Sequence, residues 1–532
     1  MSTELTSRFV RDLPPGDGYS DRLSQELRLI EHHRLVPLFC QVQDIIRLIP
    51  DIPHNIRGSA GSSLVCYLLG ISHIDPLEWG LGLARFIHDL RPDMPDIDID
   101  VPWNRRDEVW ARVFGKYGRR AARVSNKVMW KERSIYREAQ RRYGPEPTDN
   151  EIEIVTNHLL GEQRCWSLHC GGVVIGEEPW AEEELLSPFQ LSWDKEDVER
   201  RGRYKIDILS SRALGQLADL SDRPLFDYPH ADGETAALWR RGDGIGVTGG
   251  ESPAFRKAAM GLEVTDRYDV ILASALIRPA AASGTRSVPF FDAWRQRREQ
   301  TSLVFDDDCI TAIADRLDVT PAKADMIRRD IVKGRIAVPE ALADIGEFTA
   351  YSFCKSHAIA YGAVVWALSW HKVRRPAAFW QAALDNCQSM YRHWVHIREG
   401  IRAGLDVERQ RRLFPVSADE EFRSKGYWTS PDELSGLLDR PVGKRVFFRG
   451  VIGAFRAYRP RLNKEAHPIT FVTIWTGERY RQLVLSGAVN LRREDFIEGV
   501  GTMEVVQNAD HLNVQQYRLY NKNDTQMRFR GF

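Results

Sequence analysis

Long apolar segments are missing from this sequence. It contains no apolar run of roughly 18 residues or more, the length that a membrane-spanning helix needs, and the segment Met1–Asp12 has no apolar signal core. Internal repeats and low-complexity segments are also missing. These absences exclude a membrane-spanning helical protein and a repeat or fibrous protein. We therefore expect a soluble, cytoplasmic protein without a membrane partner.

Paired cysteines and net charge are missing as well. The 7 cysteines form no Cys-x-x-Cys pair, which indicates free thiols in a reducing compartment. Cys165, His169 and Cys170 are close in sequence, but without a second group of ligands, buried small residues are favoured over a zinc site. The 74 Lys and Arg residues balance 74 Asp and Glu residues, so the total charge does not indicate a nucleic-acid partner.

What the sequence does contain is typical of a globular protein with several domains. Its 532 residues, 43% hydrophobic and 28% charged, are too many for one core, and we expect three or four domains. Basic residues are concentrated in residues 116–142, which fits either a phosphate-binding groove or the solvated face of a helix. These residues are Lys116, Arg119, Arg120, Arg123, Lys127, Lys131, Arg133, Arg137, Arg141 and Arg142.

Apolar periodicity predicts helices in four stretches. Residues 20–48 have apolar positions at helical spacing with a break near Pro37, and Ser62–Leu69 forms a short apolar helix. Residues 105–144 have a helical and increasingly basic pattern, and residues 254–400 are mainly helical. Together with the strands that alternating and short apolar patterns predict, these helices indicate that the first part of the chain mixes helices and strands.

Strand patterns occur in the first half of the chain and again near its end. Residues 96–101 alternate strictly between acidic and aliphatic side chains, and the runs 171–176 and 204–209 are short and apolar. Closely spaced strand-like runs near the C-terminus predict a small closed or partly open barrel. These runs are Arg445–Phe455, Ile469–Thr476, Arg481–Leu485 and Gly501–Val506.

The alternating strand carries a clear chemical signal. Because successive side chains of a strand point to opposite faces, Asp96, Asp98 and Asp100 share one face. Three like charges repel, so a cation should face them, and oxygen ligands of this kind suit Mg²⁺. Asp207 is a further acid on a second apolar strand, and acids that converge from two strands are typical of a two-metal phosphoryl-transfer site. A solvent-facing edge strand with acids for solubility is the alternative.

A turn of small residues is the second candidate element. The segment Arg57–Ser63 (RGSAGSS) is expected to open a helix. Small residues let backbone N–H groups approach a phosphate, and a helix N-terminus favours an anion. No Gly-Lys-Ser/Thr sequence follows, so the turn is not a Walker A motif, and a plain tight loop is the alternative.

Several motifs together resemble a known family. They are Arg57–Val65, Leu69–Ser72, Asp75–Pro76, Arg85–Phe86, Met94–Asp100, His169–Ile175 (HCGGVVI), Asp194–Lys195, Lys205–Leu209 (KIDIL), Gly242–Val247, Glu251–Ser252, Arg278–Pro279 and Ser352–Tyr361. In order and spacing these motifs resemble those of the bacterial DNA polymerase III alpha subunits, the C-family DNA polymerases. The glycine-serine turn most resembles the error-prone branch of that family.

The resemblance implies a multidomain α+β fold. It comprises a nucleotidyltransferase (polymerase beta-like) palm with a mixed sheet, a reduced helical thumb, helical fingers and a C-terminal OB-type β-barrel. The implied boundaries are residues 1–115 and 169–245 for the palm, 116–168 for the thumb, 246–400 for the fingers, 401–440 for a linker and 441–525 for the OB-fold. No PHP region precedes the palm and little remains for helix-hairpin-helix elements, so we expect a reduced form of the family.

The resemblance also implies roles for single residues. Asp98, Asp100 and Asp207 correspond to the catalytic acids that bind two Mg²⁺ ions. The turn residues Arg57, Gly58, Ser59, Ser62 and Ser63 correspond to the site of the incoming triphosphate. Further contacts with the triphosphate or primer are implied for Arg85, Arg91 and Lys205 of the palm and Arg328, Arg329 and Lys333 of the fingers. For each single arginine, a plain surface charge is the alternative.

The implied function is that of a DNA-directed DNA polymerase. It would extend primer-template DNA with deoxynucleoside triphosphates, distributively and without proofreading, in repair, translesion or accessory replication. Template-independent nucleotidyl transfer and a non-catalytic DNA-binding or assembly module are the alternatives. The peptide Gln410–Phe414 (QRRLF) resembles a sliding-clamp-binding motif, with an ordinary basic helix end as its alternative. The implied OB-fold contains aromatic residues that could provide a DNA-stacking surface, although for most of them a place in the barrel core is expected. These residues are Phe447, Phe448, Phe455, Tyr458 and Trp475.

Overall fold

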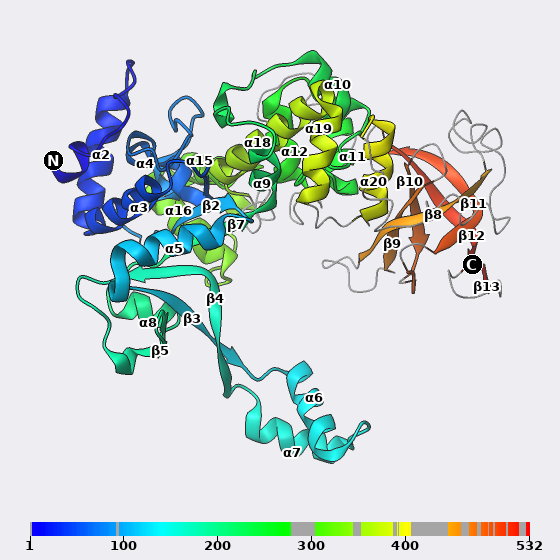
Figure 1. The fold of residues 1–532 in the computed structure, drawn as a ribbon, viewed down its shortest axis with the longest axis horizontal. Coiled ribbons are helices and arrows are strands. Elements are labelled where there is room, and N and C mark those ends of the chain that lie inside the picture. Colours follow the sequence, from blue (N-terminus) through cyan, green and yellow to red (C-terminus); the bar gives the residue numbers. More distant parts are fainter. Residues whose placement is uncertain are drawn as a thin grey trace. The chain divides into compact units, whose positions relative to one another are not determined.

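The chain divides into two compact units, Met1–Ser211 and Arg212–Phe532, in the computed structural model (Figure 1). Within the described residues, every helix is too short or too polar to cross a lipid bilayer. The peptide Gln410–Phe414 lies outside the described residues. The structure describes residues 3–91, 95–277, 304–343, 353–386, 391, 393–405, 445–458, 468–475, 480–487, 489–492, 495–506, 509–520 and 528–531.

The first unit begins with the helices that apolar periodicity predicts. After α1 (Thr3–Thr6), α2 (Tyr19–His32) and α3 (Val36–Leu48) are separated by a short break. Pro37 lies in the first turn of α3. A backbone N–H group at this position has no hydrogen-bond partner within the helix, so proline is tolerated there. The predicted helical region with a break near Pro37 is confirmed.

A seven-stranded mixed sheet forms the centre of the first unit, in the order β1-β2-β7-β4-β3-β6-β5. β2 and β7 are parallel neighbours, and each buries its isoleucines almost completely. The strands predicted around residues 96–101, 171–176 and 204–209 are therefore confirmed and lie side by side. The strands are β1 (Asn55–Arg57), β2 (Ile97–Pro102), β3 (Ala121–Met129), β4 (Gln163–Ile175), β5 (Leu185–Ser187), β6 (Gln190–Leu191) and β7 (Ile206–Ser211).

Residues 105–144 do not form one helical stretch, and that prediction is wrong. The segment between α5 and α6 forms strand β3, in which Ala122 and Val124 are buried and Arg123 between them is partly exposed. The first half of β3 is buried on both faces, so it lacks the simple alternation of a half-exposed strand, and the basic residues around it resemble a helical pattern. The helices of this unit after α3 are η1 (Gly58–Ser62), α4 (Leu64–Leu68), η2 (Leu83–Arg85), α5 (Arg106–Tyr117), η3 (Gly118–Arg120), α6 (Glu132–Tyr143), α7 (Asp149–Leu159), η4 (Glu182–Glu184) and α8 (Lys195–Arg200).

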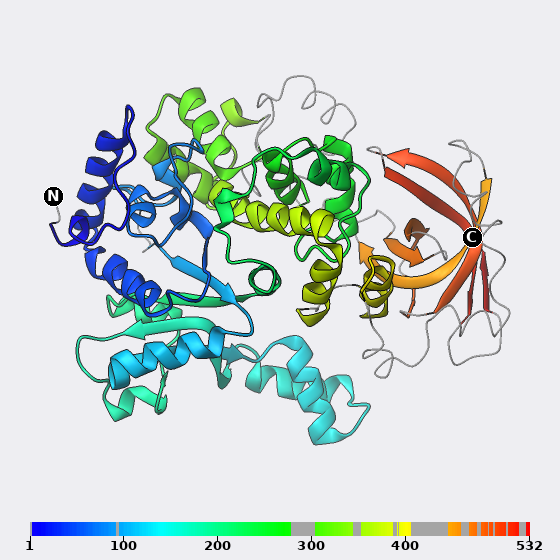
Figure 2. The same cartoon turned by 45° about the horizontal axis from the view of Figure 1, so that its top comes forward.

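An arm, residues 126–168, extends from this sheet. β3 and β4 continue as a two-stranded ribbon whose ends are joined by α6 and α7 (Figures 1 and 2). Ile135, Ala139 and Val155 form a small buried cluster between the two helices, and Trp130 packs against it. The arm therefore has its own small core at the far end of two strands that also belong to the central sheet.

The second unit begins with packed helices around α18 (Lys355–Arg374), which is apolar nearly all round and mostly buried. A Cβ atom at Gly362 would lie 2.5 Å from Cγ1 of Ile271, so glycine permits the close approach of α12. The prediction that residues 254–400 are mainly helical is confirmed for the described residues. The other helices are α9 (Arg212–Ala218), η5 (Leu225–Asp227), α10 (Gly233–Arg240), α11 (Pro253–Leu262), α12 (Arg267–Leu276), α15 (Asp306–Leu317), α16 (Pro321–Val332), η6 (Glu340–Leu342), α19 (Pro376–Asp385) and α20 (His393–Arg402).

A second sheet follows these helices, with the order β10-β9-β8-β11-β12-β13 and an additional parallel pairing of β10 with β12. Phe448 and Trp475 are each 1% exposed, which agrees with their expected place among buried residues. The side chains of Phe447 and Tyr458 lie outside the described residues. The strands are β8 (Arg445–Tyr458), β9 (Ile469–Trp475), β10 (Tyr480–Ser486), β11 (Phe496–Val506), β12 (Ala509–Tyr520) and β13 (Arg528–Gly531).

Candidate functional site

Two acids face each other at the centre of the first sheet. The parallel register of β2 and β7 pairs Asp98 with Asp207, and on either side of each acid an isoleucine points into the core. Oδ1 of Asp98 and Oδ1 of Asp207 are both buried, and neither has a hydrogen-bond partner among the described residues. Unpartnered buried carboxylate oxygens are costly unless a cation or a proton satisfies them. The pair therefore has the donor chemistry that a divalent cation with oxygen ligands requires.

The charge of this acid pair is only partly balanced. Nζ of Lys205, whose side chain is 7% exposed, bonds Oδ2 of Asp207 and lies 4.0 Å from Oδ1 of Asp96. Burial, and after it the neighbouring charge of Asp207, raises the pKa of Asp98 to about 7. One buried lysine therefore does not offset the repulsion between two carboxylates, and the site favours either an added cation or a proton.

Asp100, the third predicted acid, is held by an arginine. The antiparallel pairing of β1 with β2 brings the Arg57 guanidinium to Asp100, with Nη2 donating to Oδ1 at 2.8 Å and Nε donating to Oδ2 at 3.1 Å. Burial raises the pKa of Asp100, while Arg57 acts to lower it. Among the described residues no group of three or more His, Cys, Asp or Glu side chains is arranged to hold a metal. The structure thus brings two of the three acids together and pairs the third with Arg57.

The glycine-serine turn passes beside the acid pair. Gly58 has a φ of 74°, a left-handed conformation that favours glycine, and a Cβ atom there would lie 3.9 Å from Oδ2 of Asp98. Ser59 is partly exposed, and Ser62 is fully buried, with a hydroxyl that has no hydrogen-bond partner in the part of the chain that the structure describes. The turn residues Arg57, Gly58 and Ser59 therefore lie at the edge of the acid pair. A charged substrate group at this edge would be close to the turn and to the acids.

The start of α4 is already occupied by a carboxylate of the chain. Glu26, which is fully buried, accepts hydrogen bonds from the N–H groups of Leu64 at 2.8 Å and Val65 at 3.1 Å. It also accepts a hydrogen bond from the Ser63 hydroxyl at 2.8 Å, and Arg22 balances its charge. The expectation that this helix N-terminus attracts a substrate anion is therefore wrong, because an acid from α2 takes the N–H groups first.

The other predicted cations are distributed over both units. In the first unit Arg85 and Arg91 are partly exposed, and Arg91 donates to the carbonyl of Phe86. In the second unit Arg328 is 7% exposed and its Nη2 donates to Oδ1 of Asp325 at 2.9 Å. Arg329 bonds the same buried carboxylate, whereas Lys333 is exposed at the end of α16. The burial and pairing of Arg328 favour a structural role for it.

His169 is a neighbour of the acid pair that we did not predict as a site residue. Its Nδ1 accepts a hydrogen bond from the N–H group of Gly172 at 2.8 Å and lies 3.5 Å from Oδ1 of Asp207. A Cβ atom at Gly172 would lie 2.9 Å from this nitrogen and 3.3 Å from Oδ1 of Asp207. The HCGG sequence was the available signal, since two glycines after a histidine allow this close approach.

Replacing Asp98 by Asn is expected to raise the melting temperature above pH 7 in the presence of EDTA. The pKa of Asp98 is about 7 in the folded protein and about 3.8 in the unfolded chain. The wild type therefore loses stability as the pH rises from about 4 to about 7, and the variant does not. Calorimetry across this range should give equal melting temperatures near pH 4 and a higher value for the variant near pH 8. Parallel curves for the two proteins would contradict the assignment.

The known proteins to which this chain is similar are those of the family that its motifs resemble. Residues 1–156 match the family model described as bacterial DNA polymerase III alpha NTPase domain. The error-prone DNA polymerase of Xanthomonas oryzae pv. oryzae (strain KACC10331 / KXO85) is 28% identical over 515 residues, which cover 78% of this chain and 47% of the relative. The error-prone DNA polymerase of Anaeromyxobacter sp. (strain K) is 29% identical over 496 residues, covering 74% and 44%. The chain thus spans about half the length of the curated relatives it matches.

Proposed function

Because the chain is related to the bacterial DNA polymerase III alpha subunits of the error-prone branch, we propose that it is a DNA-directed DNA polymerase. It would add deoxynucleotides to a primer 3′ end on primer-template DNA, distributively and without proofreading, in repair, translesion or accessory replication. The observation that carries this proposal is the paired register of Asp98 and Asp207, each with a buried and unpartnered carboxylate oxygen. Both acids belong to motifs that resemble those of the family.

We assign the catalytic role to Asp98, Asp100 and Asp207. When bound, two Mg²⁺ ions would supply activation of the primer hydroxyl and stabilisation of the charge that develops on the transferred phosphoryl group. Lys205 orients Asp207 through its buried ion pair. Asp100 lies two residues after Asp98 on β2, and it can join the pair once Arg57 turns to another anion.

We assign the binding of the incoming triphosphate to the turn beside the acids. Arg57 presents a planar guanidinium that can exchange the carboxylate of Asp100 for phosphate oxygens, since both fit its paired N–H groups. Gly58 and Ser59 offer a backbone that lacks bulky side chains next to Asp98. Ser62 and Ser63 are fully buried and support the turn, and Glu26 fixes the start of α4 behind it.

We further propose family subdomains for the two units. The palm comprises residues 1–115 and 169–245, the thumb residues 116–168, the fingers residues 246–400 and the OB-fold residues 441–525. The OB assignment is supported by strand pairing, because β8, β9, β10, β12 and β11 form a closed circuit of paired neighbours. Clamp binding by Gln410–Phe414 remains a proposal from sequence alone.

The ion pair between Arg57 and Asp100 also favours a second candidate function. A carboxylate that already has a bidentate partner gains less from a metal, as expected of a palm that survives as a non-catalytic DNA-binding module. The two candidates differ in whether the protein turns over. A scaffold binds DNA without consuming deoxynucleotides, whereas the polymerase consumes them only with a template.

Primer extension tests the proposed function directly. The purified chain, a labelled primer-template, the four deoxynucleoside triphosphates and Mg²⁺ are expected to give templated products that EDTA abolishes. The same primer without a template controls for template-independent transfer and should give no product. DNA binding without any extension would contradict the polymerase proposal and support the scaffold.

A further inference from the structure

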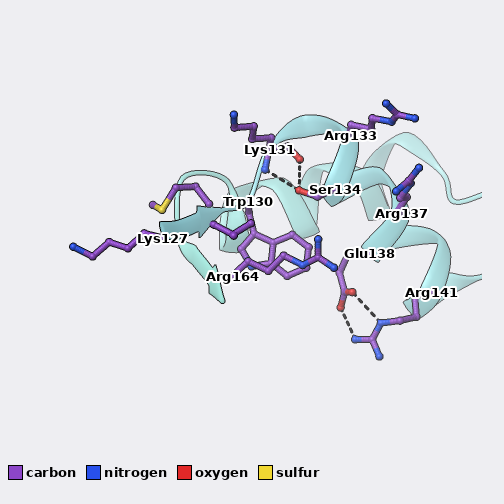
Figure 3. Close-up of a pocket in the computed structure, with 11 residues that line it drawn as sticks. Lys127, Trp130, Lys131, Arg133, Ser134, Arg137, Glu138, Arg141 and Arg164 are labelled. Atoms are coloured by element: carbon purple, nitrogen blue, oxygen red, sulfur yellow. Dashed lines mark hydrogen bonds and ion pairs between the residues drawn. The ribbon is translucent and has the colours of Figure 1, made fainter. Parts of the chain in front are cut away.

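A basic cavity lies in the arm, far along the ribbon from the acid pair. Its volume is about 740 Å³, and α6 lines one side while the ends of β3 and β4 line the other (Figure 3). We call it the arm pocket, and its principal lining residues are Trp130, Lys131, Arg133, Arg137, Arg141 and Arg164. A cavity of this size is comparable to that of a small-molecule ligand site.

Helical spacing explains why so many cations face the arm pocket. Arg133, Arg137 and Arg141 are four residues apart on α6, so they share one face of the helix. The acid among the residues that line the pocket is Glu138, and it is paired with Arg141 at 2.6 Å and with Arg142 at 2.8 Å. The acid is therefore neutralised by arginines, and the remaining lining charge is positive.

The cations of the pocket differ in how they are engaged. Nζ of Lys127 is paired with both Asp194 and Asp197 at 2.9 Å, so its charge is already balanced. Lys131, Arg133 and Arg137 are exposed, and none of the carboxylates in the described ranges forms an ion pair with them. Three neighbouring cations without a carboxylate partner create a local potential that favours a phosphate group.

A planar surface lies next to these cations. The guanidinium carbon of Arg164 is 4.8 Å from the centre of the Trp130 ring, so the two planar groups form a cation–π contact (Figure 3). The backbone of Trp130 is fixed by hydrogen bonds to Glu162 at 2.9 Å and from Gly161 at 3.2 Å. The ring also packs on the small core of the arm, which holds the stack in place.

We propose that the arm pocket binds an unpaired nucleotide of single-stranded DNA, with the phosphate on Lys131, Arg133 and Arg137 and the base stacked on Arg164. This inference rests on the proposed function, because a DNA polymerase has DNA as the polyanion that this pocket would bind. The backbone of a duplex presents phosphates but keeps its bases paired and stacked inside, so it would leave the Arg164 plane unused. An unpaired base with its own phosphate matches both features of the pocket.

The arm pocket can be tested separately from the acid pair. β4 runs from Arg164, in the pocket, to Gly172, which pairs with Asp207, and its register against β3 shifts between these two residues. On the neighbouring strand β3, Arg123 pairs with Val173 and Val128 pairs with Cys165, so five residue steps (128 − 123) separate the two sites, which is roughly 17 Å at about 3.3 Å per residue. Substitutions in the pocket therefore remove no contact of the acids, and substitutions of the acids remove no residue of the pocket lining.

Fluorescence anisotropy of labelled oligonucleotides, with the full chain in EDTA, tests the proposal. Replacing Arg164 by Ala is expected to weaken binding of an oligo-dT strand about tenfold and of a blunt duplex of equal length less than twofold. Arg137→Ala is expected to weaken both and to reduce the slope of log affinity against log salt by about 0.7 to 0.9. Arg119→Ala is the matched control, because Arg119 is an exposed arginine of the same unit that neither lines the pocket nor pairs with a residue that does.

Three outcomes would overturn the inference. If Arg164→Ala weakens the binding of the single strand and of the duplex equally, the pocket binds only the DNA backbone. If the substitution weakens the binding of neither, no base stacks on Arg164. Competition by free dTTP as strong as by oligo-dT would make the pocket a mononucleotide site. Failed primer extension with arm-dependent binding would count against the proposed function alone.

Discussion

Replacing Asp98 or Asp207 by Asn is expected to lower primer extension roughly 1000-fold, which corresponds to about 4 kcal/mol of lost transition-state stabilisation. The two acids lie in register on β2 and β7, and each has a buried carboxylate oxygen without a hydrogen-bond partner among the described residues. Asparagine keeps the shape of the side chain but removes the charge that would hold a divalent cation. Single-turnover extension of a labelled primer-template at saturating Mg²⁺ measures the loss.

Asp96→Asn is the matched control for these two substitutions. The Asp96 side chain is 43% exposed and lies 3.5 Å from Lys195, and Lys205 lies between it and Asp207. Extension by this variant is expected to fall less than tenfold. An Asp98→Asn protein that keeps a tenth of the wild-type rate, while melting at or above the wild-type temperature, would show that the assigned role is wrong rather than that the variant failed to fold.

Local sequence patterns predicted the helices and strands correctly where apolar side chains recur with a clear helical or strand period. Residues 96–101 alternate without exception and form β2, and the apolar spacing of residues 20–48 gives α2 and α3. Residues 121–129 were misjudged because arginine, serine, asparagine and lysine interrupt the apolar positions and match a charged helix face equally well. The hydrogen bonds to β4, a strand 34 residues further on (163 − 129), decide the structure there.

The pairing of the site residues depended on contacts that no local pattern contains. Asp98 and Asp207 are 109 residues apart (207 − 98), and only the parallel pairing of β2 with β7 places them opposite each other. The sequence indicated both acids, but not that Arg57 would take Asp100. Nor did it indicate that Glu26, from a helix far from the turn, would fill the start of α4. Long-range packing determined each of these results.

Replacing Arg57 by Ala is expected to weaken deoxynucleotide binding at least tenfold and to lower kcat/KM roughly 100-fold, because a charged hydrogen-bonding partner of phosphate is worth about 1.5 to 3 kcal/mol. The same substitution removes the bidentate partner of Asp100, a carboxylate that is 8% exposed. Leaving this charge unpaired is expected to lower the melting temperature in EDTA and to lower the Mg²⁺ concentration that supports half-maximal activity. Calorimetry and Mg²⁺ titrations of primer extension measure these two effects.

A double-mutant cycle separates the two roles of Arg57. Nucleotide binding to the primer-template complex, measured without turnover, is compared for Arg57→Ala alone, for Asp100→Asn alone and for the double variant. If Arg57 contacts the triphosphate, its removal weakens nucleotide binding equally in both backgrounds. If Arg57 serves only to hold Asp100, the effect disappears once Asp100 is neutral. Arg57→Lys keeps the charge but loses the paired N–H groups, so its nucleotide affinity is expected between those of the wild type and Arg57→Ala. An affinity equal to that of the wild type would mean that charge alone, and not the bidentate geometry seen with Asp100, recognises the phosphate.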